Sequence, residues 1–594
     1  MQKNLNSTPL AKIVTDNVFM FIVLLLCGCF LSVCLCHDLR WDFANYHYYN
    51  AFAFLHNRLN YDIVPASINT FFNPLLDLPL YFAIQYFNDN LPILFALQGI
   101  WAGLLLFMLY KICSLFFNLK SFEGFGLTIL VILIAVGGQA TLIQIGTSTN
   151  EIPIAFMILS GLYILLKMIK FPDTQNLWKF LTAGLIMGAA LGLKQTAVVY
   201  CISAGLMLMC CFPYFKNPVK SIFVFAIGGF IGFLVINGWW MWKLWVLYDN
   251  PVFPFLNGVF KSEYFDNFNY RDERYLPTLK TLLIYPYLWY FPPHEISEFK
   301  YYDFRLTLIY TVLWSILISC LWHRNIKAKY QTQRLETALY FYVFISFMLW
   351  LSVFSILRYA VVIEVLSAIF LVWIFKFFMR KNKALVIIYG IFLLFFGFII
   401  IQQAQNWSNL RKDGKFAYVE PVNFPENTLL KLYNFRTSGV VPEWAKNNQF
   451  RVVGYMHYNC RYMTGSDFVE RGKFRKERDA IVKQHTGPIV IVYEDAIGFN
   501  ANNMEVYKKM KTQCLKIQQA GKIPASYDCG AGSCITWKAL EKALVAELEK
   551  DNYFCRPLRN NLDKSLKICV PYKLKAQILG ENHERKNCGF VAVL

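Results

Sequence analysis

The sequence predicts a polytopic α-helical membrane protein with about eleven transmembrane helices and a C-terminal soluble α/β domain. Hydrophobic residues make up 56% of the 594 residues, and aromatic residues make up 18%. Apolar runs of membrane-spanning length recur along the first two-thirds of the chain, which a soluble multidomain protein would not need. The formal net charge is +20, but lysine and arginine fall mainly in short loops between these runs. That distribution is typical of membrane topology and argues against nucleic-acid binding.

The first apolar run extends from Val18 to Cys36 without a charged residue. It would form a helix roughly 28 Å long, enough to cross the apolar core of a bilayer. Because the run is longer than a signal-peptide core and lacks a small-residue cleavage site, we expect it to remain as an anchor. Lys3 and Lys12 precede it, so the positive-inside rule places the N-terminus in the cytoplasm. The loop that follows is therefore expected outside.

Further apolar runs divide the rest of the membrane region. One lies between Arg358 and the basic segment 376–383, and the others lie at about 91–110, 124–143, 151–166, 219–245, 304–321, 336–354 and 384–401. Residues 180–213 are too long for one span, and Gly192, Lys194 and Gln195 mark a break between two short spans. With that break facing outward, every clearly basic short loop lies on the cytoplasmic side.

The expected domains follow from this topology. Residues 1–401 form a membrane domain with large outward loops at 37–90 and 246–303, and residues 402–594 form a periplasmic domain. The protein is thus expected in the bacterial inner membrane as a multi-pass protein. In the C-terminal segment, strand-like runs at 449–457 and 488–495 precede a helix-like run at 535–550, which predicts a small α/β fold.

The C-terminal segment contains seven of the 16 cysteines. In an oxidising compartment they are expected to form disulfides with one thiol left over, and sequence alone does not reveal the pairing. A zinc site at Cys529 and Cys534 is the weaker alternative, because no second pair has metal-ligand spacing.

Polar side chains crowd the start of the first outward loop, directly after a helix that needs none of them. The loop opens HDLRWDFANYHYYN and continues through NYDIVPASINTFFNPLLDLPLYF. Polar groups at membrane depth are costly unless they are paired or hydrated. We therefore expect this loop to form part of a functional site.

Asp42 is the first choice for a general base in this loop. Partial desolvation at a lipid–water boundary raises the pKa of a carboxyl group toward neutrality, which suits that role. Asp38 lies one helical turn earlier and would share a face with Asp42 if the first helix continues. The alternatives are that either carboxylate pairs with Arg40 or caps a short helix beginning near Phe43. Together the two aspartates also offer oxygen ligands for a divalent cation, so a metal requirement stays open and no other cofactor is indicated.

Asn45 and His47 follow Asp42 and suit sugar recognition through amide and imidazole hydrogen bonds. Their tyrosine neighbours, Tyr48 and Tyr49, fit an interfacial aromatic belt better. Structural roles in ordering the loop are expected for three further residues, Asp62, Asn73 and Asp77.

Two basic residues are predicted at the same outward face as this loop. Lys194 lies in the break between two short spans, and Arg358 begins a later one. Either side chain could bind a phosphate, lysine as a point charge and arginine through two parallel N–H groups. The alternative is that both side chains extend to the lipid headgroups. His294 and Arg305, within and just after the second large loop, are candidates to reach an acceptor, or else interfacial anchors. Glu364 lies within a span and is expected to form an ion pair with a neighbouring helix.

The sequence resembles the GT-C superfamily of polytopic membrane glycosyltransferases, and within it a group of bacterial inner-membrane proteins. The resemblance covers roughly residues 15–400 and rests on the segments WDFANYHYYNAFAFL, YDIVPASINTFFNPLLDLP, GLKQTA, NPVFPFLNGVFKSEYF and ILRYAVVIE. It implies sugar transfer from a polyprenyl-phosphate carrier, with the catalytic aspartate in the region of Asp42. It also implies a second acidic residue on a later outward loop, for which Glu151 is available. Relatives tend to have aspartate near this point, and the plainer interpretation of Glu151 is a helix-dipole partner.

The expected function is an inverting glycosyltransferase at the outer face of the inner membrane. It would move a sugar from a polyprenyl-phosphate-linked donor to an envelope glycan, lipid or protein acceptor. The sequence has no P-loop, dinucleotide-binding fingerprint or zinc-protease motif, which favours a lipid-linked donor. A transporter or flippase of lipid-linked sugars is the main alternative, but it would need charges in several helices and an internal repeat. An O-antigen ligase or polymerase, whose large loop comes late, and an inactive scaffold are the others.

Overall fold

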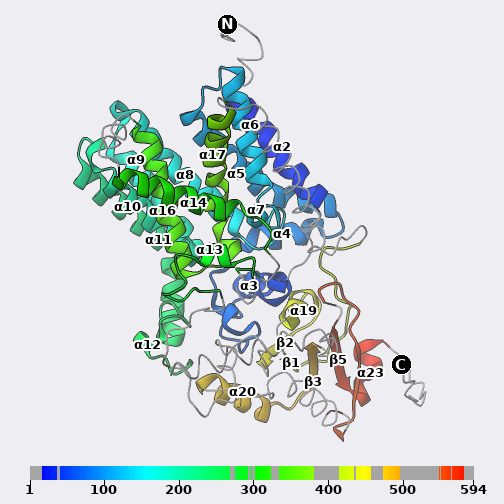
Figure 1. Ribbon diagram of the computed structural model, residues 1–594. Helices are drawn as coiled ribbons and strands as arrows, with labels where there is room; N and C mark the ends of the chain where they lie inside the picture. Colours follow the sequence, from blue (N-terminus) through cyan, green and yellow to red (C-terminus); the bar gives the residue numbers. More distant parts are fainter. Residues whose placement is uncertain are drawn as a thin grey trace. The chain divides into compact units, whose positions relative to one another are not determined.

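The computed structural model contains two compact units, each built from segments far apart in the sequence (Figure 1). Unit 1 comprises Met1–Arg40, Leu78–Lys243 and Asp272–Lys415, and unit 2 comprises Trp41–Asp77, Leu244–Arg271 and Phe416–Leu594. The polar start of the first loop therefore folds with the C-terminal segment. The structure describes residues 17–35, 41–265, 267, 275–291, 296–297, 301–322, 333–379, 414–433, 436–455, 472–494, 548, 550–563 and 565–580.

Unit 1 is built from apolar helices. Among the described residues, six helical segments are long and apolar enough to cross a membrane. They are α2 (Asn17–Leu35), α5 (Leu91–Phe116), α8 (Glu151–Lys170), α11 (Pro218–Tyr248), α16 (Arg334–Val353) and η7 (Leu357–Ala360) with α17 (Val361–Met379). Shorter apolar helices accompany them: α6 (Phe122–Val136), α9 (Leu177–Leu193), α10 (Val198–Cys210) and α14 (Arg305–Trp322). These helices confirm the predicted polytopic fold, and the span predicted at 384–401 lies outside the described residues.

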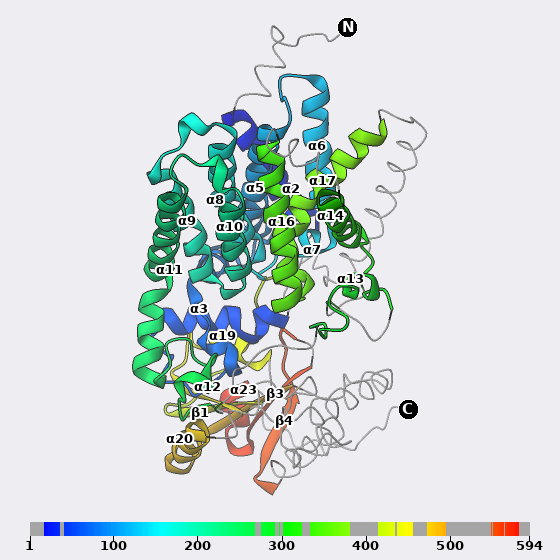
Figure 2. The same ribbon diagram turned by 60° about the vertical axis from the view of Figure 1, so that its left-hand side comes forward.

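The helices of unit 1 pack closely where their side chains are small. A Cβ atom added to Gly99 of α5 would lie 2.6 Å from the carbonyl oxygen of Gly28 of α2, so only glycine fits there. Small residues at such crossings let helix backbones approach in a membrane, where packing rather than hydrophobic burial drives association. Helices α8, α9, α10 and α16 likewise lie side by side (Figure 2).

The break predicted at Lys194 is confirmed. Helix α9 ends at Leu193, Lys194 is extended with φ −148° and ψ 119°, and a 3₁₀ turn, η5 (Gln195–Ala197), leads into α10. The chain thus interrupts its helix where the lysine stands.

The helix predicted at about 124–143 is shorter than expected. Helix α6 ends at Val136, and a short helix, α7 (Gln139–Leu142), follows two glycines. Adjacent glycines disfavour a continuous helix because they lose much backbone entropy in it. The resulting break leaves carbonyl and N–H groups of two helix ends to be satisfied by other residues.

Within its described residues, unit 2 contains a five-stranded mixed sheet with strand order β2-β1-β3-β5-β4. Its strands are β1 (Thr428–Tyr433), β2 (Phe450–Tyr455), β3 (Ile489–Glu494), β4 (Tyr553–Pro557) and β5 (Leu566–Pro571). Strand β1 is parallel to β2 and β3, whereas β5 is antiparallel to β3 and β4. Helices α19 (Val440–Trp444), α20 (Gly472–Gln484) and α23 (Lys575–Leu579) accompany it. Strands β2 and β3 fall within the two predicted strand-like runs, and the sheet confirms the predicted α/β fold of the C-terminal segment.

The first loop extends this sheet at its β2 edge. The N–H of Ile63 donates to the carbonyl of Val452 at 2.9 Å, and the N–H of Gly454 donates to the carbonyl of Ile63 at 2.7 Å. Ile63 therefore pairs in parallel with Val453. Backbone pairing at an otherwise open edge joins the loop to the C-terminal domain within one folded unit.

Candidate active site

The first cluster of candidate residues lies on a helix with an unusual turn. Helix α3 (Tyr48–Leu55) is preceded by a π-helical turn, η1 (Phe43–His47), in which the N–H of Tyr48 donates to the carbonyl of Phe43. Asp42 is the N-cap of this turn but has helical backbone angles and makes no side-chain capping bond. The alternative that Asp42 serves as a helix cap is therefore wrong. Asp42 is buried, with 9% of its surface exposed.

A π turn brings together residues that an α-helix would separate. Its hydrogen bond joins positions five apart, so such positions lie about one turn from each other. Asp42 and His47 have this spacing. In a regular α-helix the close positions would instead be three or four apart. The wide turn therefore places Asp42 and His47 toward the same side, and π turns of this kind are frequent at functional sites.

His47 forms a buried pair with Asp77. Its Nδ1 lies 2.6 Å from Oδ1 of Asp77, and both side chains are about 5% exposed. The other ring nitrogen, Nε2, has no hydrogen-bond partner among the described residues, nor has either amide atom of the fully buried Asn45. Buried polar groups are normally bonded, so a cluster of open donors and acceptors is suited to a polar ligand.

The C-terminal domain holds η1 directly. The hydroxyl of Ser438, in the 3₁₀ turn η8 (Arg436–Gly439), donates to the carbonyl of Asn45, and the hydroxyl of Tyr48 donates to Glu443. A Cβ atom on Gly439 would lie 2.6 Å from the carbonyl oxygen of Ala44. Because η8 follows the carboxyl end of β1, the sheet positions the turn that carries Asp42.

A second network fixes the loop to the sheet through Asp62. This buried carboxylate accepts two hydrogen bonds from Arg58, at 2.7 and 2.8 Å, and one from the hydroxyl of Tyr49 at 2.9 Å. It also accepts the N–H of Val452 at 2.9 Å. Burial and the neighbouring carboxylate raise the pKa of Tyr49 well above its ordinary value, so Tyr49 acts as a neutral donor. Tyr49 is thus a buried structural group, and the prediction that it belongs to an interfacial belt is wrong.

The second cluster, in unit 1, contains three of the predicted residues. Lys194 forms an ion pair with Glu151 at the start of α8 and donates to the carbonyl of Thr149 at 2.9 Å. Its ammonium lies 5.6 Å from the ring centre of Tyr359, and the guanidinium of Arg358 lies 5.3 Å from the same centre. Two cations therefore lie near one aromatic ring, and the buried carboxylate of Glu151 pairs with one of them.

The backbone around these cations is well supported. Gln144 donates to the carbonyl of Arg358 at 3.0 Å and accepts the hydroxyl of Thr149 at 3.0 Å. The hydroxyl of Tyr200 donates to the carbonyl of Tyr359. The second carboxylate oxygen of Glu151 has no hydrogen-bond partner among the described residues. Lys194 and Arg358 are partly exposed, and their cationic groups suit an anion.

Arg305 has a different place from the one predicted. It is buried, pairs with Asp303 at 2.7 Å, and donates to the carbonyls of Ile134 and Gly137. Glu364 accepts the N–H groups of Ala140 and Thr141, at 3.0 and 2.7 Å. Arg305 thus caps the end of α6 and Glu364 caps the start of α7. These contacts give Arg305 a structural role, and Glu364 uses helix N–H groups in place of the expected ion pair.

Several expectations lie outside the described residues. Asp38, His294, and Cys529 with Cys534 are among them. Within the described part of the chain, no group of three or more histidine, cysteine or acidic residues is arranged to hold a metal ion. Cys555 and Cys569, which face each other on β4 and β5, form a disulfide, as expected for an outward domain.

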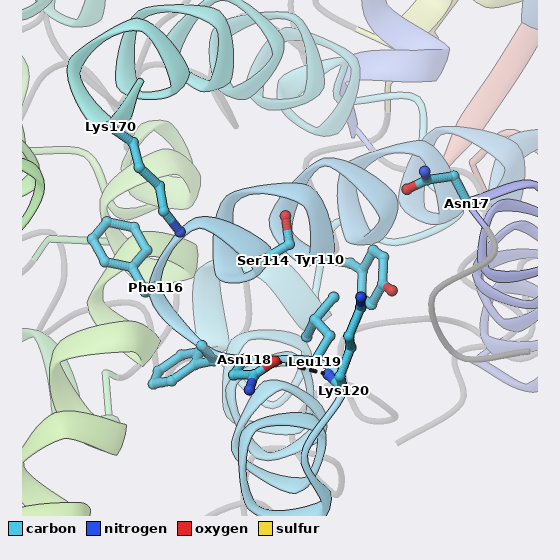
Figure 3. A pocket seen from close by; sticks show the side chains of 9 residues that line it. Asn17, Tyr110, Ser114, Phe116, Asn118, Leu119, Lys120 and Lys170 are labelled. Carbon is cyan, nitrogen blue, oxygen red and sulfur yellow. Dashed lines mark hydrogen bonds between the residues drawn. The ribbon is translucent and has the colours of Figure 1, made fainter. Parts of the chain in front are cut away.

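A separate hollow of about 530 Å³ lies at the ends of α5 and α8 (Figure 3). Asn17, Ser114, Lys120 and Lys170 contribute its polar lining, and Phe116 its apolar lining. These helix ends carry the loops predicted to be cytoplasmic. The hollow contains none of the candidate site residues.

Sequence reasoning missed two members of the clusters. Asp77 was expected only to order the loop, yet it is the partner of His47. Sequence reasoning does not single out Tyr359, although it follows Arg358 directly and its ring centre lies 5.6 Å from the ammonium of Lys194 and 5.3 Å from the guanidinium of Arg358. The available signals were the aspartate in PLLDLP and the Arg-Tyr pair at the start of a span.

Comparisons with known proteins find four similar chains among solved structures. No protein-family model and no curated protein matches the sequence. The crystal structure of ArnT from Cupriavidus metallidurans bound to undecaprenyl phosphate is similar, with a TM-score of 0.45 and 13% identity. The match covers 80% of this chain and 93% of that chain. A similarity at this level carries no inference about activity.

Proposed function

We propose that the protein is a GT-C-type glycosyltransferase of the bacterial inner membrane. It transfers a sugar, with inversion, from a polyprenyl-phosphate-linked donor to an envelope glycan, lipid or protein acceptor. The observation that carries this proposal is the buried polar set that follows Asp42 on η1, where Asn45 and His47 keep atoms without hydrogen-bond partners among the described residues. A helix that served only for packing would place apolar side chains there.

In this proposal Asp42 removes the proton from an acceptor hydroxyl, and the oxygen attacks the anomeric carbon of the donor sugar. Asn45 and His47 bind sugar hydroxyls, because an amide and an imidazole offer both donors and acceptors. General-base assistance of this kind typically contributes 10²–10⁴-fold to a rate.

The cations of unit 1 are assigned to the donor phosphate. The ammonium group of Lys194 has three N–H donors, and two of them bond Glu151 and the carbonyl of Thr149, so one is available for the phosphate. The planar guanidinium of Arg358 offers further N–H donors. Negative charge that develops on the leaving phosphate is stabilised by such preorganised groups. Glu151 holds Lys194 in place, so in this account it is a positioning residue.

The C-terminal domain is assigned a supporting role. Its η8 and α19 contact η1 and α3, which supports the idea that the domain orders the turn carrying Asp42. The acceptor's identity and any additional acceptor contacts of the domain are open to experiment.

The test is a mass-spectrometric profile of lipids and envelope glycans. It compares cells that carry the wild-type protein, a deletion, and Asp42→Asn at matched protein levels, with Asp173→Asn as an exposed control. The proposal expects Asp42→Asn to match the deletion, with one sugar lost from an envelope product and its lipid-phosphate donor accumulating. If Asp42→Asn behaves as the wild type while the deletion alters the profile, Asp42 is not the base.

A further inference from the structure

A buried histidine that is paired with a buried carboxylate has its tautomer and ring orientation fixed by that carboxylate. An ionised carboxylate only accepts hydrogen bonds, so Asp77 requires His47 to donate from Nδ1. In the neutral ring the opposite nitrogen, Nε2, is then an acceptor. The 2.6 Å contact thus sets one tautomer and leaves an open basic nitrogen.

The pair differs from an ordinary buried histidine in what surrounds it. A histidine that only fills a core normally has both ring nitrogens bonded. Here Nε2 is buried and without a partner among the described residues, and the wide turn of η1 brings His47 to the side of Asp42. The turn therefore carries a carboxylate and an oriented imidazole at positions five apart.

Several charged groups lie around this pair in the part of the chain that the structure describes. Asp42 and Asp77 are the titratable groups on η1 and at the end of the neighbouring 3₁₀ turn, η3 (Pro74–Leu76). On η8, which packs against η1, Arg436 forms ion pairs with Glu494 and Asp563. On α19, Glu443 binds Lys446 at 2.7 Å. Neither neighbour leaves an unbalanced positive charge that would oppose an imidazolium.

We propose that His47, oriented by Asp77, is the final acceptor of the acceptor hydroxyl's proton; this rests on the proposed function. The hydroxyl O–H bond breaks and its proton passes to the carboxylate of Asp42. The oxygen forms a bond to the anomeric carbon, and the bond from that carbon to the donor phosphate breaks, with its electron pair leaving on the phosphate. The proton then moves from Asp42, through a bridging water, to Nε2 of His47, where the carboxylate of Asp77 stabilises the imidazolium. Asp42 is thereby restored as a carboxylate for the next turnover.

The experiment compares single-turnover rates of the full chain in membranes, using the sugar-lipid donor that accumulates in the deletion strain. The variants are His47→Gln and Asp77→Asn, and the matched control is His56→Gln, a histidine at the end of α3 whose Nδ1 contacts the carbonyl of Phe52 at 2.9 Å. We expect His47→Gln to lower the single-turnover rate at saturating donor by roughly 10²–10⁴-fold. Asp77→Asn should lower the rate similarly, because an amide can donate to Nδ1 and so favour the wrong tautomer. His56→Gln should match the wild type.

The pH profile separates proton transfer from a structural role. As pH falls, Asp42 and His47 both take protons from solvent, and the wild-type rate should decline along an acid limb. In His47→Gln only Asp42 remains to shape that limb, so the limb should move to a different pH. A His47→Gln variant that keeps at least half of the wild-type rate, or that loses rate but keeps the acid limb at the wild-type pH, overturns the inference and leaves Asp42 as the base. A wild type that transfers no sugar refutes the proposed function itself.

A spectroscopic measurement on the wild-type protein tests the inference even if the variants fail to fold. ¹⁵N NMR of wild-type protein with ¹⁵N-labelled histidine, in bilayers, reports which tautomer His47 adopts. The signal of His47 is identified by its loss in His47→Gln or by its measured distance to Asp77. The proton is expected on Nδ1 at neutral pH. A proton on Nε2 alone contradicts the inference whatever the activity.

Discussion

Asp62 accepts a hydrogen bond from the backbone N–H of Val452 at 2.9 Å, although the two residues are 390 positions apart in the sequence. The same carboxylate binds Arg58 and Tyr49 within the first loop. One buried side chain therefore joins the segment that carries Asp42 to strand β2. The C-terminal domain is in this sense part of the structure that orders the candidate active site.

Replacing Asp62 should destabilise unit 2 strongly. Asp62→Asn removes the buried charge that pairs with the partly buried Arg58, and breaking a buried pair in this way costs about 3–5 kcal/mol. Thermal unfolding of the purified chain measures the effect. The exposed Asp173→Asn serves as control and should leave the unfolding temperature unchanged. An Asp62→Asn variant as stable as the wild type would show that this network is unimportant for folding.

A change in the C-terminal domain should also impair transfer. Gly439→Ala places a methyl group 2.6 Å from the carbonyl oxygen of Ala44, which must shift η1. Gly205→Ala is the matched control, since a Cβ there meets nothing within 4 Å. Product formation in cells should fall at least tenfold for Gly439→Ala and stay unchanged for Gly205→Ala. Equal activity of both variants would show that the contact between the C-terminal domain and η1 does not affect sugar transfer.

Lys194 should matter for donor binding. Lys194→Met removes a charge-assisted contact worth about 1.5–3 kcal/mol, which corresponds to roughly tenfold to hundredfold weaker binding of polyprenyl phosphate. Lys179→Met, at the other end of α9, is the control and should bind as the wild type does. Binding to protein in detergent is measured by the quenching of tryptophan fluorescence. Unaltered binding by Lys194→Met would assign this lysine to packing.

The lowered pKa of Glu420 predicts how the stability of unit 2 depends on pH. Burial alone would raise the pKa of Glu420, but hydrogen bonds from Arg556 and Arg559 outweigh it and lower the pKa below the ordinary 4.5. A depressed folded-state pKa stabilises the fold above the ordinary value, and this stability is lost as the pH falls through the folded-state pKa. Glu420→Gln should therefore lower the unfolding temperature at pH 7, and the difference from wild type should shrink progressively below about pH 4.5. A difference independent of pH would refute the electrostatic explanation.

The disulfide between Cys555 and Cys569 provides a test of the compartment in which the C-terminal domain lies. If the C-terminal domain lies in the periplasm, alkylation of intact cells without reductant should leave Cys555 and Cys569 unlabelled, and mass spectrometry should recover their linked peptides. The bond closes a loop of 14 residues, so removing both cysteines should cost about 3 kcal/mol. Full alkylation of both thiols without reductant would place the domain in a reducing compartment.

Much of the fold follows from local sequence patterns. Apolar runs of about 20 residues predict the long helices because each must satisfy its own backbone in lipid. The break at Lys194 is visible as glycine, lysine and glutamine inside an apolar stretch. The end of α6 was missed because apolar residues continue beyond Gly137 and Gly138, and the capping groups Arg305 and Glu364 come from distant helices.

The candidate site is less predictable, because it depends on contacts between distant segments. Asp42, Asn45 and His47 stand out by composition, but nothing near them indicates a π turn or the pairing of His47 with Asp77. Likewise, the strand-like pairing of Ile63 with Val453 depends on a sheet formed nearly 400 residues later in the chain.

The most direct test of the central claim uses the purified protein in proteoliposomes with a radiolabelled polyprenyl-phosphate sugar and an envelope extract as acceptor. The account predicts that the sugar leaves the lipid, that one polyprenyl phosphate is released for each sugar transferred, and that Asp42→Asn abolishes both. Movement of the intact donor across the bilayer without cleavage would contradict the account and identify a transporter of lipid-linked sugars.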